Sequence, residues 1–271
     1  MKLQIASINS GSNGNCYYIG NDEEAVLIDA GVACRETERR LRDLDLDIKK
    51  IKAVFISHEH KDHISGVAVL SKRYQWPVYI TQKTLRNCRP GIEKHLIRFF
   101  TSDEEISLGS ITIRAFSKFH DAHDPHSFII QCETNCVGVF TDIGRVCKNV
   151  ILHFRKCHAV FLESNYDEDM LAKGNYPLHL KRRITNGDGH LSNNQALQLF
   201  CEHKWAGLKL LILSHLSANN NKEETVQELF SKHAGNTEIF VASRYRPSPV
   251  FVINEKFLRD ENRKMQQLTL F

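Results

Sequence analysis

Short apolar runs alternate with amphipathic stretches along the chain, and this alternation predicts strands interleaved with helices. No internal repeat, low-complexity segment or linker rich in proline and glycine interrupts residues 1–253, so we interpret them as one continuous α/β domain. We expect two mixed β-sheets packed face to face with helices outside. The predicted strands are residues 3–8, 16–19, 25–28, 53–56, 78–80, 111–116, 128–132, 137–140, 159–162, 210–213 and 239–241, and the main predicted helices are residues 35–43, 64–73, 193–203 and 222–233.

Polar side chains that could bind a ligand follow several of these strands closely. A rigid sheet can hold such side chains on the short loops at its strand ends. We therefore expect these strand ends to converge at one edge. The residues concerned are Asp29, His58, His120, Asp142 and His215.

Length and composition limit the possible classes of protein. The 271 residues, 42% of them hydrophobic, suffice for a sizeable core. The 36 basic and 32 acidic residues give a net charge of +4, which favours an anionic partner only mildly and does not identify nucleic acid. The first residues lack a signal sequence and no later run is long enough to span a membrane, so we expect a cytoplasmic protein without membrane contact. None of the eight cysteines forms a CxxC pair, and we expect reduced, mostly buried thiols.

The densest chemical signal is the segment HEHKDH at residues 58–63. It places His58, His60, Asp62 and His63 within six positions. Neutral imidazole and carboxylate groups suit zinc, and also manganese where oxygen ligands are more numerous. The alternative is a solvated charged turn after a buried strand, which the density of ligand-type residues disfavours. We interpret HEHKDH as the core of a two-metal hydrolase site.

One motif supplies too few ligands for two metals, so others must come from later in the chain. His120 opens the segment HDAHDPH, in which His123 and His126 are rival candidates that the residues alone do not exclude. Asp142 follows a strand in VFTDIG and could bridge both ions, although it could also cap a helix that begins near Arg145.

Two further histidines are ambiguous when each is considered alone. His215 follows the most apolar strand of the chain, where a core histidine bonded to backbone is an equally good interpretation. His190 lies in NGDGHLSNN just before a helix that Ser192 is expected to cap. A helix N-terminus attracts anions such as phosphate, but an ordinary capped helix also explains these glycines.

The segment SGSNGN at residues 10–15 is a tight turn rich in amides and hydroxyls. By itself it indicates only a hairpin. Ser10, Ser12 and Asn13 are candidate contacts to a substrate phosphate.

Taken together, these residues make the chain resemble the metallo-β-lactamase superfamily, whose signature HxHxDH matches residues 58–63. Within it, the chain looks most like the YycJ/WalJ-type exonucleases, relatives of ribonucleases J and Z. The resemblance extends to about residue 250 and implies an αββα sandwich. It is carried by SGSNGN at residues 10–15, LIDAG at 27–31, HDA at 120–122, GHLSN at 189–193 and SHLSANNN at 214–221.

The resemblance implies two divalent metal ions, zinc or manganese. One would be bound by His58, His60 and His120, and the other by Asp62, His63 and His215, with Asp142 bridging the two.

Three other roles follow from the same resemblance. Asp29 matches an early aspartate that we interpret as a support for the HEHKDH loop. His190 matches a histidine that faces the scissile phosphate in the nuclease relatives. We expect Asp62 to orient the attacking water and His190 to donate a proton to the departing oxygen.

The C-terminal residues 254–271 form a charged tail that ends in QLTLF. QLTLF resembles the peptide with which bacterial DNA replication and repair proteins dock onto the sliding clamp. Leu268, Leu270 and Phe271 would fill apolar pockets while Gln267 fixes the register. The alternative is that this apolar end folds back on the domain.

We therefore expect a two-metal phosphodiesterase, a 5′–3′ DNA exonuclease of replication or repair. DNA is favoured over RNA by the tail and the resemblance, because Lys181, Arg182 and Arg183 would contact phosphate equally well in either polymer. Rival hypotheses are an RNA-processing enzyme and a thioesterase or lactonase of the same fold, which would need neither a basic channel nor GHLSN. A scaffold with a vestigial site is disfavoured because every expected ligand position holds a residue that can bind a metal.

Overall fold

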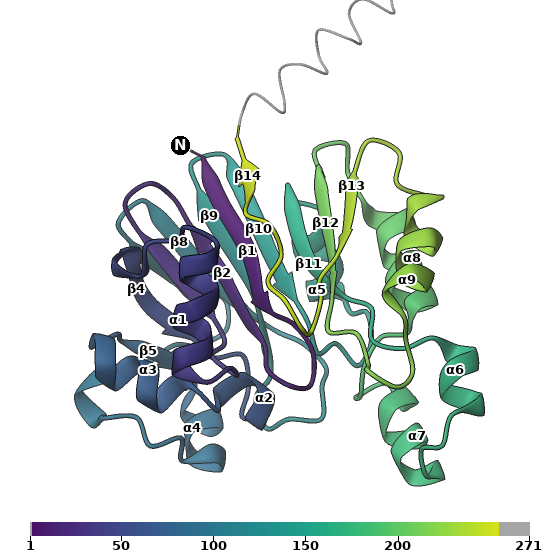
Figure 1. Cartoon of the computed structure of the whole chain (residues 1–271), viewed down its shortest axis with the longest axis horizontal. Helices are drawn as coiled ribbons and strands as arrows, with labels where there is room; N and C mark the ends of the chain where they lie inside the picture. The colour runs from purple at the N-terminus through teal and green to yellow at the C-terminus, as the bar shows by residue number, and fades with distance from the viewer. Residues whose placement is uncertain (1, 255–271) are drawn as a thin grey trace, which may run out of the picture.

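The computed structural model describes residues 2–254, whose strands form two seven-stranded sheets (Figure 1). Across the first sheet the order is β14 (Phe251–Ile253), β1 (Leu3–Asn9), β2 (Cys16–Gly20), β3 (Ala25–Ile28), β4 (Ile51–Phe55), β5 (Val78–Ile80) and β6 (Ile97–Phe99). Across the second it is β13 (Glu238–Val241), β12 (Leu210–Ser214), β11 (Ala159–Glu163), β10 (Asn135–Phe140), β9 (His126–Cys132), β8 (Ile111–Ser117) and β7 (Glu105–Leu108).

Both sheets are mixed, as predicted. Strands β3 to β6 pair in parallel and so do β10 to β13, whereas the remaining neighbours pair antiparallel. Parallel neighbours need crossover connections, and parallel strands end at the same edge of their sheet. The loops after β3, β4, β10, β11 and β12 can therefore meet, and these loops carry most of the candidate site.

Helices cover both outer faces, which confirms the αββα sandwich (Figure 1). The first sheet is flanked by α1 (Cys34–Asp43), α2 (Lys61–Ile64), α3 (Val67–Tyr74) and α4 (Gln82–Cys88), and the second by α5 (Lys148–Phe154), α8 (Asn193–His203) and α9 (Glu223–Ser231), while α6 (Glu168–Lys173) and α7 (Leu178–Thr185) lie beyond the ends of the second sheet. Among residues 2–254, no helix has both the length and the hydrophobicity needed to cross a membrane.

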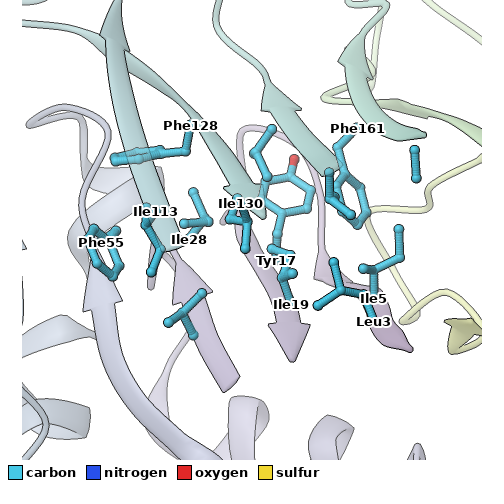
Figure 2. Packing of buried hydrophobic residues seen from close by; sticks show 14 of the residues in the cluster. Leu3, Ile5, Tyr17, Ile19, Ile28, Phe55, Ile113, Phe128, Ile130 and Phe161 are labelled. Carbon is cyan, nitrogen blue, oxygen red and sulfur yellow. The ribbon is translucent and has the colours of Figure 1, made fainter. Parts of the chain in front are cut away.

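The main core lies between the sheets, where side chains from both meet (Figure 2). Phe55 of the first sheet packs edge-on against Phe128 of the second at 5.9 Å between ring centroids, and Tyr17 lies 4.9 Å from Phe161. All four rings are fully buried, and burying a side chain of this size stabilises the fold by roughly 1.5–3 kcal/mol. These contacts fix the two sheets relative to one another.

Strands buried on both faces explain the continuous apolar runs of the sequence. In β1, Leu3 and Ile5 face the other sheet, whereas Ala6 and Ile8 pack in a second cluster with residues of α1 and α3. A third cluster lies between the second sheet and α5, α8 and α9. Strand positions were therefore predictable, because both alternating faces are hydrophobic.

The predicted helix at residues 64–73 was wrong in extent, because the chain breaks into α2 and α3 at Ser65 and Gly66. The Gly66 amide donates to the Ala30 carbonyl at 2.7 Å, and a β-carbon at Gly66 would lie 1.9 Å from the Val32 carbonyl oxygen. The break therefore lets the metal-motif segment pack tightly against the loop after β3.

Three strands and three helices were not predicted, namely β6, β7, β14, α4, α6 and α7, and α5 begins at Lys148, three residues after the helix start expected near Arg145. The three strands lie at sheet edges; β6 and β7 mix exposed and partly buried positions, whereas β14 is an apolar run of only three residues. The last described strand, β14, ends at Ile253. The predicted tail lies outside the described residues except for Asn254.

Candidate metal centre

The strand ends converge as expected, at the edge where the parallel strands finish. Register accounts for much of this: β11 pairs with β12 so that Glu163 lies opposite Ser214, one residue before His215. The side chains brought together are His58 after β4, Asp62 and His63 in α2, His120 after β8, Asp142 after β10, Glu163 at the end of β11, His190 before α8 and His215 after β12.

His58, His60 and His120 form the first donor group. Nε2 of His58 lies 3.0 Å from Nδ1 of His60, which lies 3.3 Å from Nε2 of His120. One nitrogen from each ring lies within 4.8 Å of the others. Such an arrangement of three imidazoles fits one metal ion with an open position.

Burial keeps these three imidazoles uncharged. It lowers the pKa of His58 and of His60, and it lowers the pKa of His120 to about 3. Neutral imidazole is the form that binds metals, because its second nitrogen carries a free lone pair. The first group is therefore ready to receive a cation.

Asp62, His63, Asp142 and His215 form the second donor group. Oδ2 of Asp142 lies 3.3 Å from Nε2 of His63, and Oδ2 of Asp62 lies 3.5 Å from Nε2 of both His63 and His215. Within residues 2–254, the buried Oδ2 of Asp142 and Nε2 of His215 have no hydrogen-bond partner. Buried polar atoms normally have one, so this pair of unsatisfied atoms fits a missing cation.

The negative charges in the second donor group also favour a bound cation. Burial alone would lower the pKa of His215, but the negative charge of Asp142 and the carboxylates of Asp62 and Glu163 raise it to about 10. The pKa of His63 is likewise raised, against its burial, by Asp142 and Asp29. A divalent cation would supply the positive charge that these buried carboxylates favour.

Asp142 connects the two groups. Its Oδ1 lies 3.8 Å from Nε2 of His120, while its Oδ2 faces His63. The rival role as a helix cap is excluded, because α5 begins at Lys148 with Cys147 at its N-cap position. The geometry therefore suits a carboxylate shared by two ions.

Groups behind the donors orient the imidazole rings. Nδ1 of His63 lies 2.7 Å from Oδ2 of Asp29, and Asp29 also accepts hydrogen bonds from the Ser57 amide and hydroxyl, each at 2.8 Å. Nδ1 of His120 lies 2.9 Å from the Gly189 carbonyl oxygen. Such contacts fix which nitrogen faces a metal.

Glu163 is a central residue that the sequence interpretation missed. Its carboxylate accepts hydrogen bonds from the amides of Asp142, Ile143 and Leu191, and its Oε1 lies 2.8 Å from Nδ1 of His190 and 3.0 Å from that of His215. It forms a third group of possible ligands with Asp142, His190 and His215. The available signal was the position of the carboxylate: Glu163 is the last residue of an apolar strand, just as Asp142 closely follows one.

Three residues of the site have an unusual backbone conformation. Asp29, Asp142 and His215 have positive φ values of 61°, 54° and 59°. Non-glycine residues adopt this left-handed region at a cost, and such residues cluster at functional sites where the surroundings enforce them. Each one turns its side chain from the end of a strand into the site.

Gly31, the last residue of LIDAG, permits the closest approach of chain segments in the site. A β-carbon there would lie 1.7 Å from the Asp62 carbonyl oxygen. The Asn15 amide donates to that same carbonyl at 2.6 Å, and the Gly31 amide donates to the Asn15 carbonyl at 2.9 Å. The loop after β3, the turn at residues 10–15 and α2 are thereby packed together.

The remaining candidate histidines lie outside the donor groups. His123 is exposed, with Nδ1 2.6 Å from Oε1 of Glu59. His126 begins β9, and its Nδ1 lies 2.9 Å from the Asp124 carbonyl oxygen. His120 is therefore the one histidine of HDAHDPH that the structure brings to the site.

The turn at residues 10–15 only partly matches its predicted role. Ser10 is 1% exposed, and its hydroxyl accepts from the His215 amide at 2.8 Å, so it cannot reach a substrate. Ser12 and Asn13 are exposed. Ser12 lines a cavity of about 180 Å³ together with His190, His215, Tyr176 and Arg183.

Comparison with known proteins identifies the family. Residues 10–142 match the family model of the metallo-β-lactamase superfamily. The chain is 32% identical over 232 residues to exodeoxyribonuclease YycJ of Bacillus anthracis, covering 83% of this chain and 86% of that one. It is 30% identical over 223 residues to exodeoxyribonuclease WalJ of Streptococcus pneumoniae, covering 79% and 82%.

A solved structure agrees on the fold. The metallo-β-lactamase fold protein YhfI of Bacillus subtilis superimposes with a TM-score of 0.71 at 17% identity, covering 93% of this chain and 99% of that one. The fold, the donor groups and the two exodeoxyribonuclease relatives lead to one assignment. The chain belongs to the metallo-β-lactamase superfamily and, within it, to the family of YycJ and WalJ.

Proposed function

We propose that this protein is a metal-dependent exonuclease that hydrolyses the phosphodiester bonds of DNA. The observation that carries the proposal is a pair of adjacent donor groups, joined by Asp142, that lies beside a cavity lined by His190. The two relatives described above, each of which matches most of the chain, are both named exodeoxyribonucleases. This supports a nuclease over a thioesterase, a lactonase or a vestigial scaffold.

The ligand assignment follows the donor groups. His58, His60 and His120 would hold one divalent ion, and Asp62, His63 and His215 the other, with Asp142 shared. Zinc suits the histidine-rich first group, and manganese tolerates the carboxylates of the second. When bound, two such ions activate water and neutralise charge on a phosphate.

Exposure distinguishes the residues that can act on the substrate. The Asp62 and His190 side chains are each 21% exposed, whereas those of His63, Asp142 and His215 are at most 3% exposed. Asp62 is therefore positioned to orient an attacking water, and His190 to donate a proton to the departing oxygen. Glu163, bonded to Nδ1 of His190, positions that imidazole with Nε2 directed away from the carboxylate.

The polar rim of the cavity suits a nucleotide. Ser12 offers a hydroxyl for a phosphate, and the exposed Asn13 follows it in the chain, while Arg183 of α7 lines the cavity in an ion pair with Asp121, which lines it too. Apolar side chains of Leu180 and Ile184 line the same cavity, which gives a base or sugar an apolar surface. A site with both kinds of surface fits a nucleic acid better than a small thioester.

A substrate panel tests this function. The metal-free protein, reloaded with zinc or with manganese, is incubated with end-labelled single-stranded and duplex DNA and RNA. We expect stepwise shortening of DNA, and an exclusive preference for RNA would contradict the proposal.

The variant His190→Ala tests the assignment of the proton donor. It should cut turnover by about 10²–10⁴-fold while metal content stays unchanged. The exposed His95, which lies away from the donor groups, supplies the control variant His95→Ala. Loss of metal in His190→Ala would show instead that His190 has a structural role.

We further propose that the C-terminal peptide docks the enzyme on the bacterial sliding clamp during replication or repair. Gln267, Leu268, Leu270 and Phe271 would make the contacts, and they lie outside the described residues. Deleting residues 267–271 should abolish capture by immobilised clamp and leave digestion of short DNA unchanged. Undiminished capture would refute the docking.

A further inference from the structure

The loop between β13 and β14 presents an aromatic side chain flanked by two arginines, Arg244, Tyr245 and Arg246. Tyr245 is 75% exposed, the highest value among the large apolar side chains that are exposed in residues 2–254. Single exposed apolar side chains are common on protein surfaces and need no explanation by themselves. The residues around Tyr245, however, distinguish it from the other exposed apolar side chains.

The backbone of this loop is fixed although its side chains are exposed. Nη2 of Arg40 donates to the Tyr245 carbonyl at 3.0 Å, and Nδ2 of Asn13 donates to the Arg244 carbonyl at 2.8 Å. The amide of Ser248 donates to a β1 carbonyl at 2.9 Å. A partner that binds to a fixed loop loses less entropy in ordering it. The backbone that carries the Tyr245 ring is thus held in place.

The same contacts tie the loop to the candidate metal centre. Asn13 belongs to the turn at residues 10–15, and the next residues of that turn contact the proposed ligands. Nδ2 of Asn15 donates to Oδ2 of Asp62 at 3.2 Å, and the Ser10 hydroxyl accepts from the His215 amide. The turn at residues 10–15 thus connects the loop that carries Tyr245 to the candidate metal centre by hydrogen bonds.

Among residues 2–254, the guanidinium groups of both neighbouring arginines lack a carboxylate partner, although Nη1 of Arg244 is buried. Within the described part of the chain, neither Arg244 nor Arg246 forms an ion pair with a carboxylate. The Arg244 guanidinium lies over the Tyr245 ring, 5.9 Å from its centroid, which leaves the opposite face for another planar group. Arg246 is exposed.

We propose that this loop is a binding platform for single-stranded DNA, on which Tyr245 stacks against a base and Arg246 contacts a neighbouring phosphate. Aromatic rings and cations along a groove are how proteins bind single strands without reading their sequence. The inference rests on the proposed nuclease function and adds where the strand runs beyond the cleaved bond. The platform raises the affinity for long strands and takes no part in hydrolysis.

The test compares Tyr245→Ala and Tyr245→Phe with the wild type. The substrates are long single-stranded DNA, a dinucleotide and the chromogenic diester bis(p-nitrophenyl) phosphate. We expect Tyr245→Ala to raise KM for the long strand about tenfold, because one stacked base is lost, with kcat unchanged. Turnover of both small substrates should stay at the wild-type value. Tyr245→Phe keeps the ring and should behave as the wild type.

Phe99 supplies the control for the loss of an exposed ring. It is 50% exposed on β6, at the opposite edge of the first sheet from β14, so Phe99→Ala should leave KM unchanged. Arg246→Gln should reduce the slope of log affinity against log salt by about 0.7, the contribution of one phosphate contact to a single strand. Arg98→Gln, also on β6, should leave that slope unchanged.

The outcomes separate this proposal from the function on which it rests. An unchanged KM for long DNA in Tyr245→Ala would overturn the platform. The exposed ring would then be a candidate contact for a protein partner instead. A Tyr245→Phe variant as weak as Tyr245→Ala would also overturn it, because the hydroxyl rather than stacking would be responsible. A wild-type protein that hydrolyses the chromogenic diester but neither binds nor shortens DNA would refute the nuclease function itself.

Discussion

Nδ1 of His190 lies 2.8 Å from Oε1 of Glu163, a carboxylate buried completely at the end of β11. Burial alone would raise the pKa of Glu163, but the charge of His190 and the hydrogen bonds from His190 and His215 hold it at about 2. The charged carboxylate favours a proton on Nδ1 of His190. One buried carboxylate thereby sets the orientation of a proposed proton donor and of a proposed metal ligand.

The variant Glu163→Gln should lower kcat by about 10–100-fold, because the amide oxygen can still accept from the Ile143 and Leu191 amides, whereas its NH2 group can neither accept from the Asp142 amide nor hold the imidazoles by charge. Steady-state kinetics on labelled DNA measures this loss. Glu168→Gln is the control, since the Glu168 carboxylate accepts hydrogen bonds, among the described residues, only from the Ser192 hydroxyl and the Asn194 side-chain amide at the start of α8. Full turnover in Glu163→Gln would show that His190 needs no such partner.

The variant Asp29→Asn should weaken metal binding by about 10–100-fold, because Asp29 holds Nδ1 of His63 at 2.7 Å behind the second donor group. Titration in a metal-buffered solution measures the dissociation constant. Asp22→Asn changes an aspartate whose side chain is 67% exposed and should leave that constant unaltered. Equal metal affinity in the wild type and in Asp29→Asn would show that Asp29 does not support the site.

The variant Gly31→Ala should destabilise the protein by about 3 kcal/mol, because its β-carbon would lie 1.7 Å from the Asp62 carbonyl oxygen and backbone must move. Urea denaturation measures the free energy of unfolding. Gly91→Ala is the matched control: the nearest neighbouring atom would be 3.8 Å away, so its positive φ alone should cost about 1–2 kcal/mol. Similar losses in both variants would mean that the contact at Gly31 relaxes easily.

Glu36 should make stability depend on pH in the acid range. Its hydrogen bonds from Arg39 and Arg40 lower its pKa from 4.5 to about 2. Because the folded pKa is the lower one, this contribution is complete above pH 4.5 and is lost as the pH falls through about 2. Glu36 is partly exposed, so Glu36→Gln should cost only about 1 kcal/mol at neutral pH.

Urea denaturation of the wild type and of Glu36→Gln at a series of pH values measures this dependence. The difference in unfolding free energy should shrink steadily below pH 4.5. A difference that stays constant down to pH 3 would contradict the assigned pKa.

Much of the site was predictable because HEHKDH is a local motif. Its ligand-type residues are neighbours in the chain, and the strand before them is apolar on both faces. Asp142 and His215 were recognisable in the same way, since each follows a central strand closely. The sandwich was also predictable, because buried strands alternating with amphipathic helices favour few other architectures.

Glu163 shows what the sequence could not reveal. It is 27 residues from His190 and 52 from His215, and nothing near it in the chain indicates that these residues meet. Likewise, the residues alone did not separate His120 from His123 and His126; the resemblance favoured His120, and the path of the loop after β8 brings it to the site, whereas Ser10 proved to be buried. Exposure of Tyr245 depends on the loop that leads into the edge strand β14.

The sequence by itself determined the local chemistry: which residues can bind metal, which runs are strands, and which short motifs accompany them. The tertiary structure decided which of these residues face one another. The physical reason is that strand order and register, set by packing between the two sheets, place Glu163 beside Ser214 and hence next to His215. Such pairings arise from the whole core and not from the residues that they bring together.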